Sequence, residues 1–199
     1  MKNFSLKLFL PFLWAIFAFP ITAQEKGTVS LTFSTLTSNS LIEPSLEGAP
    51  SLDITRSRDI GLNYFKSIKS WLAWETGLEY SLFNMRSISA LNPPAPRDTT
   101  YSSLSLVSVP VGLKVNFLKH FFVNGGVLVD FDTNSGGFVD NQTGLGAYVG
   151  VGIKYDFKFG ASVFVNPYGK LHSLIPFSGG SVHYRVMESG VRFGVGYRL

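Results

Sequence analysis

The sequence predicts an all-β protein, an eight-stranded antiparallel up-and-down transmembrane β-barrel. Apolar and polar residues alternate with a period of two in segment after segment, and no comparable helical period follows residue 27. These segments are joined by short and long connections in turn. Such alternation is typical of strands with one apolar and one polar face, and alternating short turns and long loops are typical of barrels that cross an outer membrane.

The N-terminal segment, residues 1–23, has the pattern of a cleaved signal peptide. Lys2 and Lys7 come before an apolar run that reaches Pro20, and Ala23 supplies a small residue before the expected cut. Pro11 and Pro20 interrupt the run, which argues against a membrane-spanning helix of about 20 apolar residues. We therefore expect residues 24–199 to form one exported barrel domain.

The composition argues against several other classes of protein. Only 15% of the 199 residues are charged, 15% are aromatic, and none is cysteine. The lack of cysteine excludes disulfide bonds and a lipid anchor on a cysteine. Outside the signal peptide, basic and acidic residues are nearly balanced and form no basic stripe. We therefore expect no nucleic-acid partner.

Eight strands are expected in order along the chain. The first, 28–34, alternates Val29, Leu31 and Phe33 with serine and threonine, and the third, 72–82, sets leucine, tryptophan and tyrosine against alanine, glutamate and glycine. The fourth to sixth continue this pattern with valine, leucine and aromatic residues, while the second, seventh and eighth are weaker. The remaining expected ranges are 52–65, 107–117, 123–131, 145–157, 160–172 and 182–199.

The connections between these strands alternate in length. Those after the second, fourth and sixth strands are short, at 66–70, 118–120 and 158–159. Those after the first, third, fifth and seventh are longer and rich in turn residues, at 37–51, 86–101, 133–142 and 173–181. A meander of this kind places both chain ends on the periplasmic side and four loops outside the cell.

Aromatic residues cluster near the expected short turns. Membrane barrels carry aromatic girdles at the level of the lipid headgroups, so we expect one girdle at this end. A second, sparser girdle at the loop end would use Phe83, Tyr101, Phe131 and Tyr184. The residues of the expected short-turn girdle are Phe65, Trp71, Phe117, Phe121, Tyr155, Phe157 and Tyr197.

The strand face opposite the apolar one combines glycines with charged and amide side chains. An eight-stranded barrel has an interior just wide enough for side chains to fill, which suits glycine beside a few long polar residues. We therefore expect the apolar face to contact lipid and a plugged polar interior in which acids and bases pair, because an unpaired buried charge is costly. The expected network consists of Glu75, Glu79, Lys114, Asp130, Lys154, Lys170 and Arg192.

The C-terminal strand ends on alternating apolar residues without a polar tail. Arg192, Gly194, Tyr197 and Leu199 resemble the C-terminal β-signal of outer-membrane proteins, although the last residue of that signal is often phenylalanine. The resemblance implies recognition by the barrel assembly machinery through this strand. The same residues also suit a strand that closes the barrel against the first one.

A wider resemblance comes from residues 104–117, "LSLVSVPVGLKVNF". This segment resembles a strand of the outer-membrane β-barrel domain family that includes PorT-like proteins, in which an apolar run with a central proline leads to a Leu-Lys ending. The similarity extends loosely over residues 27–199. It implies a small outer-membrane barrel, often without an assigned activity.

The sequence offers little support for metal or cofactor chemistry. His120, His172 and His183 lie far apart and show no ligand spacing, so we expect no metal site. Glycines such as Gly150 and Gly152 keep the strand period and come before no helix, so no cofactor-binding loop is expected.

Two alternatives to a structural role stay open. A lipid-modifying outer-membrane hydrolase could use His172 or His183 with Ser173 and Glu188, but adjacent residues of a regular strand point to opposite faces, which separates His172 from Ser173. A secreted lipocalin-like binder of hydrophobic ligands would have the same alternation, but the chain lacks the Gly-x-Trp entry of such proteins.

The function that we expect is structural or interactive rather than enzymatic. The barrel would lie in outer-membrane lipid and carry loops that contact envelope proteins or surface molecules, or it would be an accessory component of an envelope or secretion machine. Candidate contacts at the loop tips are Ile42, Pro44, Leu46 and Phe177, although single exposed apolar residues also occur by chance.

Overall fold

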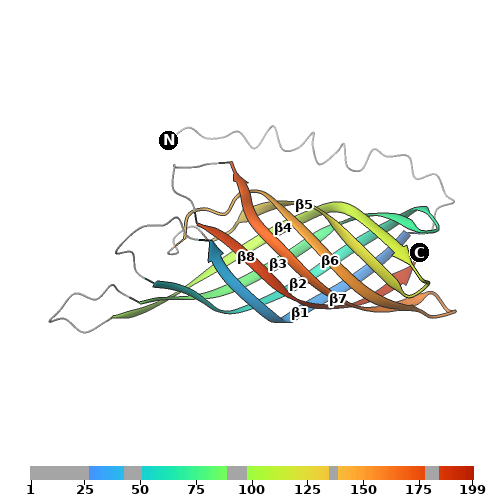
Figure 1. The fold of residues 1–199 in the computed structure, drawn as a ribbon, viewed down its shortest axis with the longest axis horizontal. Coiled ribbons are helices and arrows are strands. Elements are labelled where there is room, and N and C mark those ends of the chain that lie inside the picture. Colours follow the sequence, from blue (N-terminus) through green and yellow to red (C-terminus); the bar gives the residue numbers. More distant parts are fainter. Residues whose placement is uncertain (1–26, 43–50, 89–97, 135–138, 178–183) are drawn as a thin grey trace.

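The computed structural model describes residues 27–42, 51–88, 98–134, 139–177 and 184–199, so the predicted signal peptide, Pro44, Leu46 and His183 lie outside it. Eight strands form one closed barrel in chain order, and each pairs antiparallel with its neighbours (Figure 1). The predicted fold class is therefore confirmed. The strands are β1 (Gly27–Ile42), β2 (Ser51–Lys69), β3 (Leu72–Ile88), β4 (Thr99–Phe117), β5 (Phe121–Asp132), β6 (Gly144–Asp156), β7 (Ala161–Pro176) and β8 (Arg185–Arg198).

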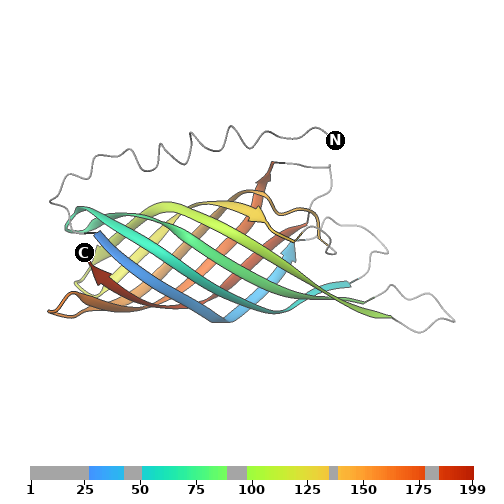
Figure 2. The ribbon, with the colours of Figure 1, turned by 180° about the vertical axis from the view of Figure 1, so that it is seen from behind.

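Several strands are longer than the sequence pattern predicts, mostly at the loop end, although β2 also extends to Lys69 at the short-turn end. β1 runs to Ile42, eight residues beyond the expected end at Ser34, because β8 pairs with it up to Arg185. The added residues are mostly small and polar and carry no alternation, so the neighbouring strand imposes the extended backbone. β3 and β4 project farthest at this end (Figures 1 and 2).

The short turns lie together at the opposite end of the barrel, where the C-terminus is also found (Figure 2). The connection between β4 and β5 contains Leu118 and Lys119 with φ angles of 47° and 65°. Left-handed backbone of this kind reverses the chain within a few residues but is uncommon outside glycine, asparagine and aspartate.

The outer wall of the barrel is apolar. Val151 and Phe193 are 56% and 44% exposed, and Val109 lies half-buried in the wall. Large apolar side chains are exposed along the strands all around the barrel, which a lipid bilayer satisfies and water does not. This orientation contradicts the lipocalin-like alternative, whose apolar residues would line the interior. Among the described residues, no helix is long and apolar enough to cross a membrane.

The interior changes from polar to apolar toward the loop end. Along β3, Glu75, Glu79, Phe83 and Met85 all point inward, and the last two belong to a buried apolar cluster. The prediction that Phe83 belongs to an outer girdle is therefore wrong, because it keeps the inward phase of Glu79. The buried members of this apolar cluster are Phe83, Met85, Leu104, Leu106 and Val186.

At the loop end, the outer faces of β2 and β3 carry charged residues, unlike the apolar wall below them. Arg86 of β3 and Asp53 of β2 form an exposed ion pair of 3.1 Å. A polar outside around an apolar inside is the arrangement of a water-soluble protein, so these strand ends stand clear of the apolar band that faces lipid.

A bulge interrupts β7 where it pairs with β6. Leu171 faces Ala147 and Ile175 faces Leu145, so three residues of β7, 172–174, lie opposite the single residue Gly146. Ser173 takes a left-handed φ of 49°, and both His172 and Ser173 are fully buried. The prediction that adjacent His172 and Ser173 point to opposite faces is therefore wrong, because a bulge suspends the period of two.

Candidate functional site

The middle of the lumen contains a network of buried charges. Glu79 of β3 accepts ion pairs from Arg192 of β8 at 3.2 Å and from Lys170 of β7 at 3.0 Å. The two basic groups come from neighbouring strands and reach across the barrel to the acid. Because all three side chains are almost completely buried, the pairs act with little screening by solvent.

Lys170 is surrounded by acidic groups. Besides Glu79, its ammonium group lies 4.0 Å from Asp59 and 3.7 Å from Glu188. The Tyr168 hydroxyl lies between these last two carboxylates, at 2.7 Å from Asp59 Oδ2 and in hydrogen-bond contact with Glu188 Oε1. One hydroxyl hydrogen serves two acceptors there, so Tyr168 can donate to only one of them at a time.

His172 continues the network toward the loop end. Its Nδ1 lies 3.1 Å from Asp130 Oδ2 and its Nε2 lies 3.3 Å from Glu188 Oε2, with no exposure to solvent. Ser108 donates a hydrogen bond of 2.5 Å to the other oxygen of Asp130. The bulge of β7 therefore carries a histidine held between two carboxylates.

Amide side chains complete the polar layer around Glu75. Asn124 Nδ2 donates to Glu75 at 2.8 Å, and Asn166 Nδ2 donates to Asn124 Oδ1 at 3.3 Å. Asn63 Nδ2 donates to Glu79 at 3.1 Å. The expectation that Glu75 forms an ion pair is wrong for the described residues, since an amide donor takes its place.

Among the described residues, the ammonium group of Lys114 contacts aromatic rings and no carboxylate lies within ion-pair distance of it. Its ammonium group lies 4.2, 4.0 and 5.0 Å from the ring centres of Phe65, Phe122 and Phe164, within cation–π distance. Phe65 therefore lies inside the barrel, and its prediction as a girdle residue is wrong. Gly152 and Gly194 make room for the rings, because a Cβ at either position would overlap Phe122 or Phe164.

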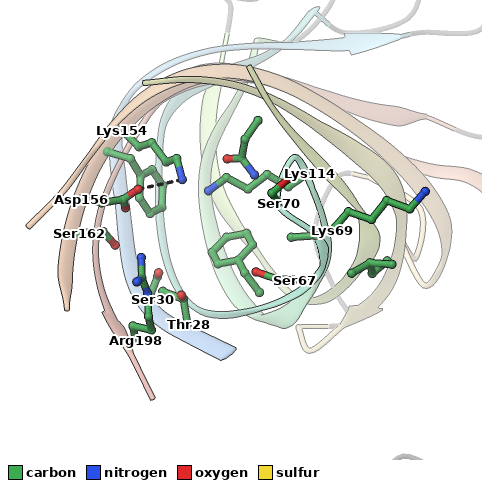
Figure 3. Close-up of a pocket in the computed structure, with 15 residues that line it drawn as sticks. Thr28, Ser30, Ser67, Lys69, Ser70, Lys114, Lys154, Asp156, Ser162 and Arg198 are labelled. Atoms are coloured by element: carbon green, nitrogen blue, oxygen red, sulfur yellow. Dashed lines mark ion pairs between the residues drawn. The ribbon is translucent and has the colours of Figure 1, made fainter. Parts of the chain in front are cut away.

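A cavity opens at the short-turn end of the lumen, and we call it the vestibule. Its volume is about 420 Å³, and its charged lining residues include Lys114, Lys154, Asp156 and Arg198. Figure 3 shows Lys154 beside Asp156, an ion pair of 3.0 Å. The expected network therefore divides into two parts, with Glu79, Asp130, Lys170 and Arg192 in the buried middle and Lys154 at the vestibule.

The other expected girdle residues lie on the outside at the short-turn end. Phe117 stacks on Phe121 with ring centres 6.0 Å apart, and Tyr155 meets Phe157 edge to face at 4.9 Å. The exposed members of the expected girdle are Trp71, Phe117, Phe121, Tyr155, Phe157 and Tyr197.

The C-terminal strand β8 was predicted both to close the barrel and to carry the β-signal. Arg192 points into the lumen, Gly194 lies against Phe164, and Tyr197 and Leu199 are exposed. β8 pairs with β1 from Arg198 to Arg185, which closes the barrel. Recognition of these residues as a β-signal stays a prediction.

Several residues of the buried network were not predicted from the sequence, namely Asp59, Tyr168, His172 and Glu188. Asp59 carried a usable signal, because it shares the inward phase of Asn63 four residues later. His172 and Glu188 were considered only as parts of a hydrolase, although His172 shares the inward phase of Lys170 two residues earlier. His120 lies in a short turn and stacks on Tyr155. No group of three metal-ligating side chains is found within the described residues.

Comparison with known proteins adds information about the fold. No family model and no curated protein sequence matches this chain. The outer membrane protein AlkL, solved in lipid bilayers, superposes with a TM-score of 0.52 at 10% identity, over 88% of this chain and 90% of that one. The fold is that of an outer-membrane β-barrel.

Two further outer-membrane barrels resemble the chain more weakly. OprG from Pseudomonas aeruginosa gives a TM-score of 0.49 at 14% identity, with 88% of this chain and 96% of that one covered. Ail of Yersinia pestis, in complex with the heparin analogue sucrose octasulfate, gives 0.44 at 13% identity, with 88% and 99% covered. The apolar wall of this barrel requires a bilayer, and closed barrels of this kind reside in outer membranes. The protein is therefore an outer-membrane β-barrel.

Proposed function

We propose that this outer-membrane barrel is plugged by its own side chains and serves as an anchor or interaction component of the cell envelope, without enzymatic activity. The observation that carries the proposal is the set of buried side chains that cross the lumen. Glu79, Lys170 and Arg192 span its middle, and the apolar cluster around Phe83 and Leu106 fills it toward the loops.

The two layers oppose conduction for different physical reasons. In the middle layer each charged group is held by partners of opposite charge or by amides, so moving one aside leaves another buried and unpaired, at a cost of several kcal/mol. The apolar layer offers no hydrogen bond to water or to a hydrated ion. A barrel of eight strands has little space left once its interior side chains are in place.

The interaction role rests on the loop end and on the resemblance to PorT-like proteins. Ile42 and Phe177 are exposed where β1 and β7 end. The resemblance of residues 104–117 to PorT-like proteins favours an accessory role, including one in secretion.

The hydrolase alternative gains no support from the lumen geometry. His172 and Ser173 are fully buried in the β7 bulge, so a lipid at the barrel rim does not reach them. His172 is also held by Asp130 and Glu188 on its two ring nitrogens, which leaves neither nitrogen free to take a proton from a nucleophile.

Electrical recording in planar bilayers tests the plug. The purified barrel, refolded and checked by heat-modifiable gel mobility, should insert without steady single-channel currents. A parallel sample of a porin with a water-filled channel verifies that the assay detects open pores. Large, steady currents from the folded barrel would overturn the proposed plug, because they require a continuous aqueous path.

A further inference from the structure

The vestibule differs from the rest of the lumen in its charge balance. Lys114, Lys154 and Arg198 line it together with a single acid, Asp156, among the described residues. In the buried middle, by contrast, Lys170 lies among three carboxylates and Arg192 pairs with Glu79. The vestibule is thus a basic cavity next to a charge network in which Lys170 and Arg192 are paired with acids.

Lys114 lacks the kind of partner that Lys170 has. Its side chain is only 7% exposed, yet no carboxylate of the described residues lies within ion-pair distance of its ammonium group. Glu75, the nearest candidate by strand register, is hydrogen-bonded by Asn124 instead. The three phenylalanine rings stabilise the charge, but ring faces are weak acceptors for the three hydrogens of an ammonium group.

Lys154 directs a second positive charge to the same place. Figure 3 shows Lys114 and Lys154 pointing toward one another inside the cavity, whereas Lys69 points away from it. Asp156 lies beside Lys154 and offsets part of its charge. Two ammonium groups that face each other repel, and an anion between them turns this repulsion into attraction.

We propose that the vestibule binds an oxyanion, a carboxylate or phosphate group carried by a small ligand that enters from the short-turn end, with Lys114 and Lys154 as its binding cations. The volume of about 420 Å³ suits a small molecule or the end of a short peptide. The filled lumen beyond Lys114 makes the vestibule a one-sided site. This inference goes beyond the proposed function, and it stands whether or not the barrel anchors other proteins.

Titration of the folded, full-length barrel in detergent tests the site. Two oxyanion probes separate the possible sources, inorganic phosphate for a free ion and N-acetylated tri-glutamate for a peptide, and N-acetylated tri-glutamine serves as the uncharged peptide control. We expect saturable binding of at least one oxyanion and no binding of tri-glutamine, measured by calorimetry. Failure of both oxyanions to bind would overturn the proposal.

Three variants locate the binding. Lys114→Met and Lys154→Gln should each weaken oxyanion binding roughly tenfold or more, since each removes a hydrogen bond to a charged group. Lys119→Gln removes the same charge from an exposed turn at the same end, outside the vestibule lining, and should leave the affinity unchanged. Lys154→Gln keeps the test decisive if Lys114→Met fails to fold. Equal affinity in the wild type and in both folded vestibule variants would show that the oxyanion binds elsewhere.

Discussion

Lys170 and Lys114 stabilise a buried ammonium group in two different ways. Lys170 lies among the carboxylates of Asp59, Glu79 and Glu188, so Coulomb attraction offsets the loss of hydration. Lys114 lies among three aromatic rings, which attract the charge more weakly. The ammonium group of Lys170 is therefore satisfied by the protein alone, while that of Lys114 keeps hydrogens that a ligand can accept.

Removal of the central acid should destabilise the barrel strongly. Glu79→Gln leaves Lys170 and Arg192 without the carboxylate that they share, and breaking a buried pair in this way costs about 3–5 kcal/mol. The free energy of unfolding, measured by urea titration in lipid vesicles, should fall by that amount. The matched control is Asp53→Asn, whose pair with Arg86 is exposed and whose loss should change the free energy by about 1 kcal/mol or less. Equal effects of the two substitutions would contradict the role of Glu79.

At the scale of elements, local departures from regular strand geometry place the side chains that matter. The bulge in β7 buries Ser173 next to His172, which keeps the inward phase of Lys170 and meets Asp130 and Glu188. The turn between β4 and β5 uses two left-handed residues, Leu118 and Lys119. Neither residue is of a type that favours this conformation, so the strand pairing on both sides imposes it.

The β4–β5 turn can therefore be improved. Leu118→Asn combined with Lys119→Gly supplies residues that adopt left-handed backbone readily. We expect the free energy of unfolding to rise by about 1 kcal/mol, because the strain at the two positions is relieved. The paired substitution Lys158→Asn and Phe159→Gly in the β6–β7 turn, where neither residue is left-handed, should bring no gain. An unchanged stability of the first variant would argue against strain in the turn.

At the scale of the whole molecule, three zones follow one another along the barrel axis. The vestibule lies at the short-turn end, the charge network fills the middle, and the apolar cluster lies toward the loops. Outside, an apolar wall gives way to polar residues such as Arg86 where the strands project. On β2 and β3, the inward face is thus apolar and the outward face charged at the loop end, the reverse of the order in the middle of the barrel.

From these zones we expect that a charge added to the outer face lowers the folding stability by an amount that depends on its position along the barrel axis. Val149→Arg places a charge on the apolar wall, where Val149 is 59% exposed, and should cost about 2–4 kcal/mol near the middle of the bilayer. Asn84→Arg adds the same side chain to the outward face of the projecting part of β3 and should be nearly neutral. Folding titrations in lipid vesicles compare the two. A similar cost at both positions would mean that the lipid band is placed wrongly.

The features that depend on alternation along a single strand were predicted correctly, whereas two aromatic residues were assigned to the wrong face. The strand number, the chain-order meander and the inward phase of Glu75, Glu79 and Arg192 followed from local alternation. Phe65 and Phe83 were assigned outward because aromatic residues near a turn suggest a girdle, although their strand phase is inward. For these two residues the period of two was the better guide than the residue type.

The sequence by itself determined which face of each strand meets lipid, because alternation is a property of consecutive residues and needs no partner. The tertiary structure decided which groups meet inside. Glu79 and Arg192 lie 113 positions apart and come together only through the stagger of a closed barrel. The bulge opposite Gly146 buries Ser173 beside His172, and Lys114 meets three rings that come from three different strands.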